Sequence, residues 1–173
     1  MNRIKRLALL PLAGLLVASG YASAESLTQI RLVDPLDEPE FYCLDLAGWG
    51  DHLRLDDPLQ AHTCKARRAG DQMFAFKEGK IVVGDTGRCL EVAGSGSPPL
   101  PGAAVIAREC KDNPLQAFTL EDNGRIVSTG SDLCLAAGED SADASGPSHV
   151  WRVLTAQKCD AVSAELTTWQ VGL

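Results

Sequence analysis

Six cysteines and three histidines are the residues of this chain with the most distinctive chemistry, as metal ligands or as redox groups. No two cysteines form a C-x-x-C pair, and the histidines at 52, 62 and 149 lack the spacing typical of zinc ligands. An even cysteine count in an exported chain is typical of disulfides. We therefore predict three disulfides, no metal site and no cofactor.

Carboxylates are the second group with catalytic potential. Two suitably spaced acids could hydrolyse a glycoside, but the sequence contains many acids and nothing that ranks one pair above another. It also lacks a G-x-S-x-G nucleophile motif and a phosphate-binding loop. We therefore expect no enzymatic activity.

The first 24 residues are typical of a secretory signal peptide. Basic residues in the first six positions precede an apolar run from Leu7 to about Val17, and small residues in an A-x-A arrangement end at Ala24. The rival interpretation, a membrane anchor, needs about 20 apolar residues, and this run is shorter. We predict cleavage after Ala24, no membrane insertion and a secreted or periplasmic product.

The predicted mature chain, residues 25–173, is strongly acidic. The whole sequence carries a net charge of −7, and residues 1–24 contain three basic residues and no acidic one, so cleavage leaves −10. Nucleic-acid binders normally have a basic face, so we expect no nucleic-acid partner. The acidic, proline-containing segment 34–40 is interpreted as a solvated linker into the first cysteine.

The elements that must position the polar residues occur three times. Cys-Leu segments begin at Cys43, Cys89 and Cys134, which are 46 and 45 residues apart. Each is followed by a second cysteine with an apolar residue five positions before it. Each repeat then closes on aromatic and apolar residues that alternate as in a half-buried strand. We expect the aromatic residues of these closing segments in the core, because they recur at one register: Phe74, Phe118 and Trp169.

Short strands explain this period better than helices, because the segments are β-branched and separated by Gly, Pro and Asp. A propeller would need four or more blades. Three repeats, at about 28–77, 78–121 and 122–173, therefore predict an all-β barrel that closes on itself and hides its sheet edges. Equivalent cysteines should make equivalent contacts. Among 15 possible connectivities, the repeat selects Cys43–Cys64, Cys89–Cys110 and Cys134–Cys159.

The chain resembles the ricin B-type β-trefoil lectins in three elements of its repeats. These are a Cys-Leu-Asp/Glu start, an apolar-x-x-x-x-Cys segment and a closing Gln-x-aromatic element. The resemblance covers about residues 28–173 and implies a β-trefoil that binds a glycan or glycoconjugate. Phe replaces the family's Trp in the first two repeats, and Thr167 replaces the closing Gln in the third.

The resemblance also implies a shallow sugar site in each repeat. Carboxylates accept hydroxyl hydrogen bonds, and amides both donate and accept. Trp49, in a loop between two glycines, is expected either at the wall of the first site or packed over its own loop. His62 stands where the family usually has Trp or Tyr. In the first repeat the carried-over residues are Asp45, Gln60, His62, Asp71 and Gln72.

The other two repeats are poorer candidates. The second carries Glu91, Arg108 and Gln116, with Arg108 as a donor to the sugar or as the salt-bridge partner of Glu91, and Ile106 replaces the amide. The third has Ala136 in place of the acid and is interpreted as structural. Structural alternatives stay open: Asp45 could accept backbone N–H bonds in its turn, and the closing glutamines could be satisfied by the backbone.

A protein-binding β-trefoil, either a toxin delivery subunit or an inhibitor-like module with decayed sugar sites, is the alternative function. Its partner would be a secreted protein, and the poor second and third sites favour it. For the lectin, we expect Asp45→Ala to abolish binding without unfolding the chain, because Asp45 is predicted in a turn outside the core.

Overall fold

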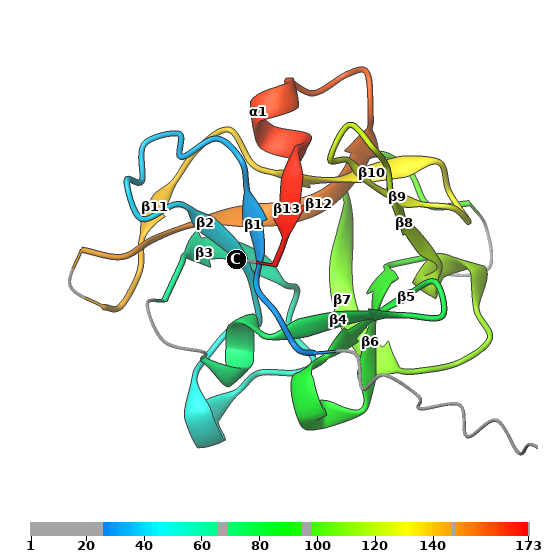
Figure 1. Cartoon of the computed structure of the whole chain (residues 1–173), viewed down its shortest axis with the longest axis horizontal. Helices are drawn as coiled ribbons and strands as arrows, with labels where there is room; N and C mark the ends of the chain where they lie inside the picture. The colour runs from blue at the N-terminus through cyan, green and yellow to red at the C-terminus, as the bar shows by residue number, and fades with distance from the viewer. Residues whose placement is uncertain (1–25, 66–68, 95–97, 147, 173) are drawn as a thin grey trace, which may run out of the picture.

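The computed structural model describes residues 26–65, 69–94, 98–146 and 148–172; the predicted signal peptide lies outside these residues. The described strands form one 13-stranded sheet that curls on itself (Figure 1). No described helix is long and apolar enough to span a bilayer. The strands are β1 (Ile30–Leu32), β2 (Tyr42–Asp45), β3 (Gln60–Thr63), β4 (Phe74–Lys77), β5 (Lys80–Val83), β6 (Arg88–Val92), β7 (Ala103–Glu109), β8 (Phe118–Leu120), β9 (Ile126–Ser128), β10 (Leu133–Ala137), β11 (Ala142–Asp143), β12 (Val150–Lys158) and β13 (Trp169–Val171).

Each repeat contributes four of these strands, and β11 is an additional short strand paired with β12. The middle two strands of every repeat pair as an antiparallel hairpin: β2–β3, β6–β7 and β10–β12. A disulfide fastens each hairpin, as the repeat predicted. The three bonds are Cys43–Cys64, Cys89–Cys110 and Cys134–Cys159.

The two ends of the chain close the sheet. β1 pairs antiparallel with β13, so the first and last strands lie side by side, blue next to red in Figure 1. The hairpins also meet one another: β12 pairs with β3 and with β7. This closure leaves β12 of repeat three directly beside β3 of repeat one, and that adjacency shapes the site described below.

The closing aromatic residue of each repeat is buried and held at the same register. The backbone N–H of Phe74 donates to the carbonyl of Thr28 at 2.8 Å, and Phe118 and Trp169 donate equivalently to Gly79 and Gly124 at 2.8 and 2.7 Å. Trp169 also donates its indole N–H to a backbone carbonyl at 3.0 Å, because a buried Trp needs a partner for that group. Phe has no such group, which explains why it can replace Trp in two repeats.

Short helical turns precede the closing strands: η2 (Gly70–Gln72), η4 (Pro114–Gln116) and α1 (Ala164–Thr167). Two further 3₁₀ turns are η1 (Gly50–His52) and η3 (Gly84–Thr86).

The acidic segment 34–40 is mostly exposed, as expected of a solvated linker, but two of its acids are bound to the folded chain. Arg152 of β12 is buried and donates to the Asp37 carboxylate at 2.5 Å, and the Tyr42 hydroxyl donates to the same oxygen at 2.7 Å. Glu38 is also buried and accepts from the Thr63 hydroxyl at 2.8 Å. A buried guanidinium requires a carboxylate partner. Composition alone cannot reveal that this partner comes from the acidic segment.

Candidate functional site

A groove of about 1070 Å³ runs between repeats one and three. Four of the predicted first-site residues line it, together with side chains from the start of β12 and the segment before it. We call it the inter-repeat groove. Its lining includes Asp45, Trp49, Gln60 and His62 from repeat one and His149 and Trp151 from repeat three.

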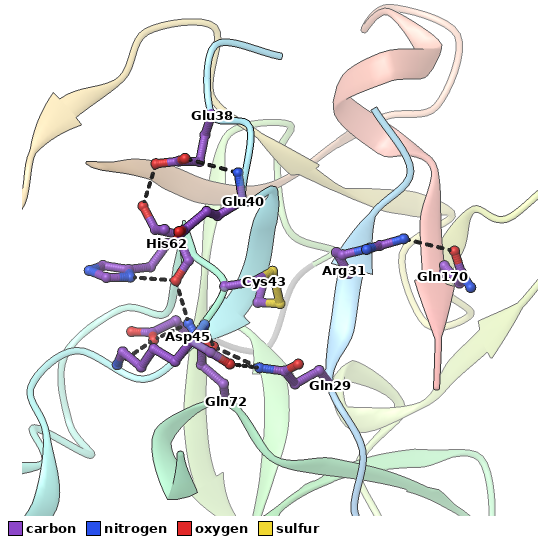
Figure 2. The surroundings of a disulfide bond; sticks show 12 residues. Gln29, Arg31, Glu38, Glu40, Cys43, Asp45, His62, Gln72 and Gln170 are labelled. Carbon is purple, nitrogen blue, oxygen red and sulfur yellow. Dashed lines mark hydrogen bonds and ion pairs between the residues drawn. A yellow bond between two sulfur atoms is a disulfide. The ribbon is translucent and has the colours of Figure 1, made fainter. Parts of the chain in front are cut away.

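Asp45 lies at the floor of this groove. It is the last residue of β2, and its side chain is 1% exposed, so its predicted place in a turn outside the core is wrong. The Asp45–Gln60 register places the two side chains together, and the Gln60 amide donates to Asp45 Oδ1 at 2.9 Å. Asp45 Oδ2 accepts from the Gln72 amide at 2.9 Å and from Lys65 Nζ at 3.2 Å (Figure 2).

Gln72 is fully buried, and the protein satisfies its whole amide. Besides Asp45, its Nε2 donates to the Thr63 carbonyl at 3.0 Å. Its Oε1 accepts from the Lys65 backbone N–H at 2.9 Å and from the Gln29 amide at 3.0 Å. Gln72 therefore positions Asp45 and the chain on both sides of Cys64, as the structural alternative for the closing glutamine anticipated.

Lys65 is the member of this cluster that sequence reasoning missed. Its ammonium pairs with the carboxylates of both Asp45 and Asp71. Burial alone would lower the pKa of Lys65, but the two carboxylates outweigh it and raise that pKa. Burial also raises the pKa of Asp45. A lysine directly follows the second cysteine in both of the first two repeats, and that repetition was the available signal.

His62 and Trp49 stand on the walls of the inter-repeat groove. His62 Nδ1 lies 3.0 Å from the Thr63 carbonyl oxygen, and Figure 2 shows the imidazole pointing away from the disulfide. Its ring meets the edge of the His149 ring at 5.4 Å between centroids. Trp49 is 67% exposed, and its ring lies 5.5 Å from that of His52. All three histidines thus line one groove, yet no group of three potential metal ligands occurs among the described residues.

Repeat two reproduces the amide arrangement around Gln116. Its Nε2 donates to Glu91 at 2.8 Å and to the Glu109 carbonyl at 3.0 Å, and its Oε1 accepts from the Lys111 N–H at 2.8 Å. Asn113, which the sequence reading did not single out, donates to the same Glu91 oxygen at 2.9 Å.

The suggested Arg108–Glu91 salt bridge is wrong. Arg108 stands opposite Cys89 in the β6–β7 register and donates to Asp56 of repeat one at 3.4 Å, where Arg88 also binds at 2.9 Å. In repeat three, Ala136 takes the position of the acid and Thr167 that of the closing amide. Ala136 is buried, and the Thr167 hydroxyl donates back to the Ser163 carbonyl.

Comparison with known proteins supports this description. A family model described as "Ricin-type beta-trefoil lectin domain" matches residues 35–165. The agglutinin from Abrus precatorius has a TM-score of 0.62 and 22% identity, covering 92% of this chain and 51% of that chain. The Vibrio vulnificus hemolysin/cytolysin beta-trefoil lectin, solved with N-acetyl-D-lactosamine bound, has a TM-score of 0.58 and 16% identity, covering 87% and 96%. The predicted β-trefoil is thereby confirmed.

Another solved structure has a similar fold. The mdaA-1 domain has a TM-score of 0.65 and 18% identity, covering 86% of this chain and 90% of that one. No curated protein sequence matched. The chain spans about half the length of the agglutinin, and at these identities the likeness to solved structures shows the fold alone.

Proposed function

The chain belongs to the family of ricin-type beta-trefoil lectin domains, and on that premise we propose that it binds carbohydrate in the inter-repeat groove. One observation carries the proposal: a buried, hydrogen-bonded carboxylate lies at the floor of a groove walled by an exposed tryptophan. Such a carboxylate is oriented before any ligand arrives, so ligand binding costs little reorganisation.

Polar recognition is assigned to Asp45, Gln60 and Lys65. Asp45 receives three hydrogen bonds from the protein, and a carboxylate has about four lone-pair sites. The Lys65 ammonium contacts both Asp45 and Asp71. It can therefore give up its contact with Asp45 and keep Asp71 as its counter-ion. A sugar hydroxyl then reaches Asp45, while Gln60 donates to or accepts from a neighbouring hydroxyl.

Apolar recognition is assigned to Trp49. Its ring is 67% exposed at the rim of the groove, and an aromatic face suits the C–H surface of a sugar ring. Gln72 and Asp71 act behind the contact surface, because both are buried and hold Asp45 and Lys65 in place. His62 contributes one edge of the wall.

We further propose that the mature chain is exported, beginning at residue 25, and that it binds without catalysis. Three disulfides support export, because such bonds persist in oxidising compartments. The N-terminal mass of the secreted protein tests the cleavage site. Incubation of the bound glycan with the protein, followed by chromatography of the products, tests for hydrolysis.

The binding site is tested by a glycan array followed by calorimetry on the best ligand, with Asp45→Asn and the matched repeat-two variant Glu91→Gln. A lost charge-assisted hydrogen bond costs about 1.5–3 kcal/mol, so Asp45→Asn should weaken binding at least tenfold and Glu91→Gln should leave it unchanged. Equal affinities of wild type and Asp45→Asn would contradict the site. A folded protein that binds no glycan but co-purifies with a secreted protein would favour the protein-binding alternative.

A further inference from the structure

Two different repeats wall the inter-repeat groove. Trp49, Gln60 and His62 come from repeat one. Directly beside His62 lie His149 and Trp151 of repeat three, both half-buried, and they also line the groove. Trp151 pairs with His62 in the β12–β3 register. The closure of the sheet therefore brings these repeat-three residues to the groove.

Hydrogen bonds behind the groove tie the repeat-three residues to the Asp45 cluster of repeat one. The backbone N–H of Val150, between His149 and Trp151, donates to the Thr63 hydroxyl at 2.9 Å. The carbonyl of Thr63 in turn accepts from Gln72, which orients Asp45. The rings of His62 and His149 meet edge to face at an interplanar angle of 89°. The wall from repeat three is therefore held in a fixed position relative to the Asp45 cluster.

The groove offers more room and more binding groups than one sugar ring uses. Its volume of about 1070 Å³ lies just above the range of roughly 300–1,000 Å³ usual for small-molecule sites. Besides Trp49, which is 67% exposed, the lining includes His149 and Trp151. An imidazole both donates and accepts hydrogen bonds, and an indole face suits a second sugar ring.

Resting on the proposed function, we propose that the inter-repeat groove binds an oligosaccharide across two repeats. One sugar occupies the subsite of Asp45, Gln60 and Trp49, and the next lies against His149 and Trp151. Repeat three, which has Ala136 at the position equivalent to Asp45, thereby supplies the second subsite. The hollow beside Arg88 and Arg108 of repeat two is smaller, about 440 Å³, and its lining does not include Glu91.

Chain length is the variable that tests this proposal. The probes are galactose, N-acetylglucosamine, N-acetyl-D-lactosamine and the tetrasaccharide of two N-acetyl-D-lactosamine units, within an array of size-graded glycans. Wild type, His149→Ala and Asp45→Asn are compared by calorimetry on the monosaccharide and the oligosaccharide of the best series. We expect wild-type affinity to rise at least tenfold from the monosaccharide to the oligosaccharide. His149→Ala should abolish that rise and leave monosaccharide affinity unchanged.

The outcomes separate this proposal from the proposed function. Wild-type affinity that does not depend on glycan length, or a His149→Ala variant that keeps the whole gain, would overturn the second subsite and leave the first intact. A complete absence of glycan binding by the folded wild type would overturn both. His149→Ala that weakens monosaccharide and oligosaccharide equally, at an unchanged melting temperature, would assign His149 to the first subsite and also overturn the proposal.

Discussion

The closing glutamines of repeats one and two make the same set of bonds in different surroundings. Gln72 and Gln116 each donate to the acid of the Cys-Leu segment and to the carbonyl before the second cysteine, and each accepts from the N–H after it. In repeat one the acid is buried with Lys65 over it, whereas Lys111 of repeat two is 65% exposed and far less engaged. The same glutamine hydrogen bonds thus form in both repeats, whether or not the acid lines the inter-repeat groove.

Repeat three folds without this arrangement of acid and amide. It has neither the acid nor the amide, and it still closes its hairpin, buries Trp169 and holds its disulfide. The polar arrangement is therefore not required for a trefoil repeat to form. Asp45 of repeat one lines the inter-repeat groove and Glu91 of repeat two does not, which points to positioning of Asp45 as the role of the arrangement in repeat one.

The largest expected effect is the loss of a disulfide. Cys43–Cys64 and Cys89–Cys110 have the same sequence separation of 21 residues, and the chain-entropy model gives about 3 kcal/mol for each. Replacing either pair by alanines should lower the free energy of unfolding by similar amounts in urea titrations. A repeat-one loss that exceeds the repeat-two loss by more than about 1 kcal/mol would show that Cys64 also supports the Lys65 and Gln72 contacts.

The glutamines give the next largest effect. Each unsatisfied buried polar group costs about 1–3 kcal/mol. Gln72→Ala leaves several such groups without a partner, and we expect about 3 kcal/mol of destabilisation against about 2 kcal/mol for Gln116→Ala, whose acid is more exposed. Thermal and urea unfolding of both variants measures the difference. A smaller loss of stability for Gln72→Ala than for Gln116→Ala would contradict the argument that the more buried acid depends more on its glutamine.

Sequence reasoning reached the fold because the fold repeats. Cysteine spacing and the alternating closing segments recur in register, and equivalent positions in a pseudo-symmetric barrel must pack alike. Phe74 and Trp169 were identified as core residues on that ground, and both are buried. The disulfide pairing followed from the same argument.

The site was less accessible, because it depends on contacts that do not repeat. Lys65 pairs with Asp71 in a separate turn, and Arg152 of repeat three meets Asp37 of the acidic segment. The wall formed by His149 exists only because β12 lies beside β3. The lysine after the second cysteine recurs in the first two repeats, but its pairing with the acids does not, and the other two contacts leave no periodic trace in the sequence.

The two lysines after the second cysteines sharpen the comparison at a smaller energy. Lys65→Met leaves two acids close together in a largely buried place, and we expect about 2 kcal/mol of destabilisation, less than for a fully buried pair. Lys111→Met removes an exposed ammonium and should cost under about 0.5 kcal/mol. Urea unfolding of the two variants tests this, and equal losses would mean that the Lys65 pairs contribute no more than surface contacts.

The smallest expected effect is on the pH dependence of stability, and it has opposite signs at two carboxylates of repeat one. Burial raises the pKa of Asp45, so the folded state takes up this proton at a higher pH than the unfolded chain, where aspartate titrates near 3.8. The contribution of Asp45 to stability therefore increases as pH falls from 7 towards 4. The hydrogen bond from Arg152, with one from Ser141, lowers the pKa of Asp37. Its contribution is present above pH 3.8 and is lost below it.

Urea unfolding of wild type, Asp45→Asn and Asp37→Asn between pH 7 and pH 3 separates the two signs. The stability of wild type relative to Asp45→Asn should grow on acidification, while its stability relative to Asp37→Asn should shrink below pH 4. If the first difference stays constant, Lys65 compensates the charge of Asp45 as fully as solvent would. Burial of Asp45 would then have no effect on the pH dependence of stability. Only the groove residues supplied by repeat three would distinguish the site of repeat one from that of repeat two.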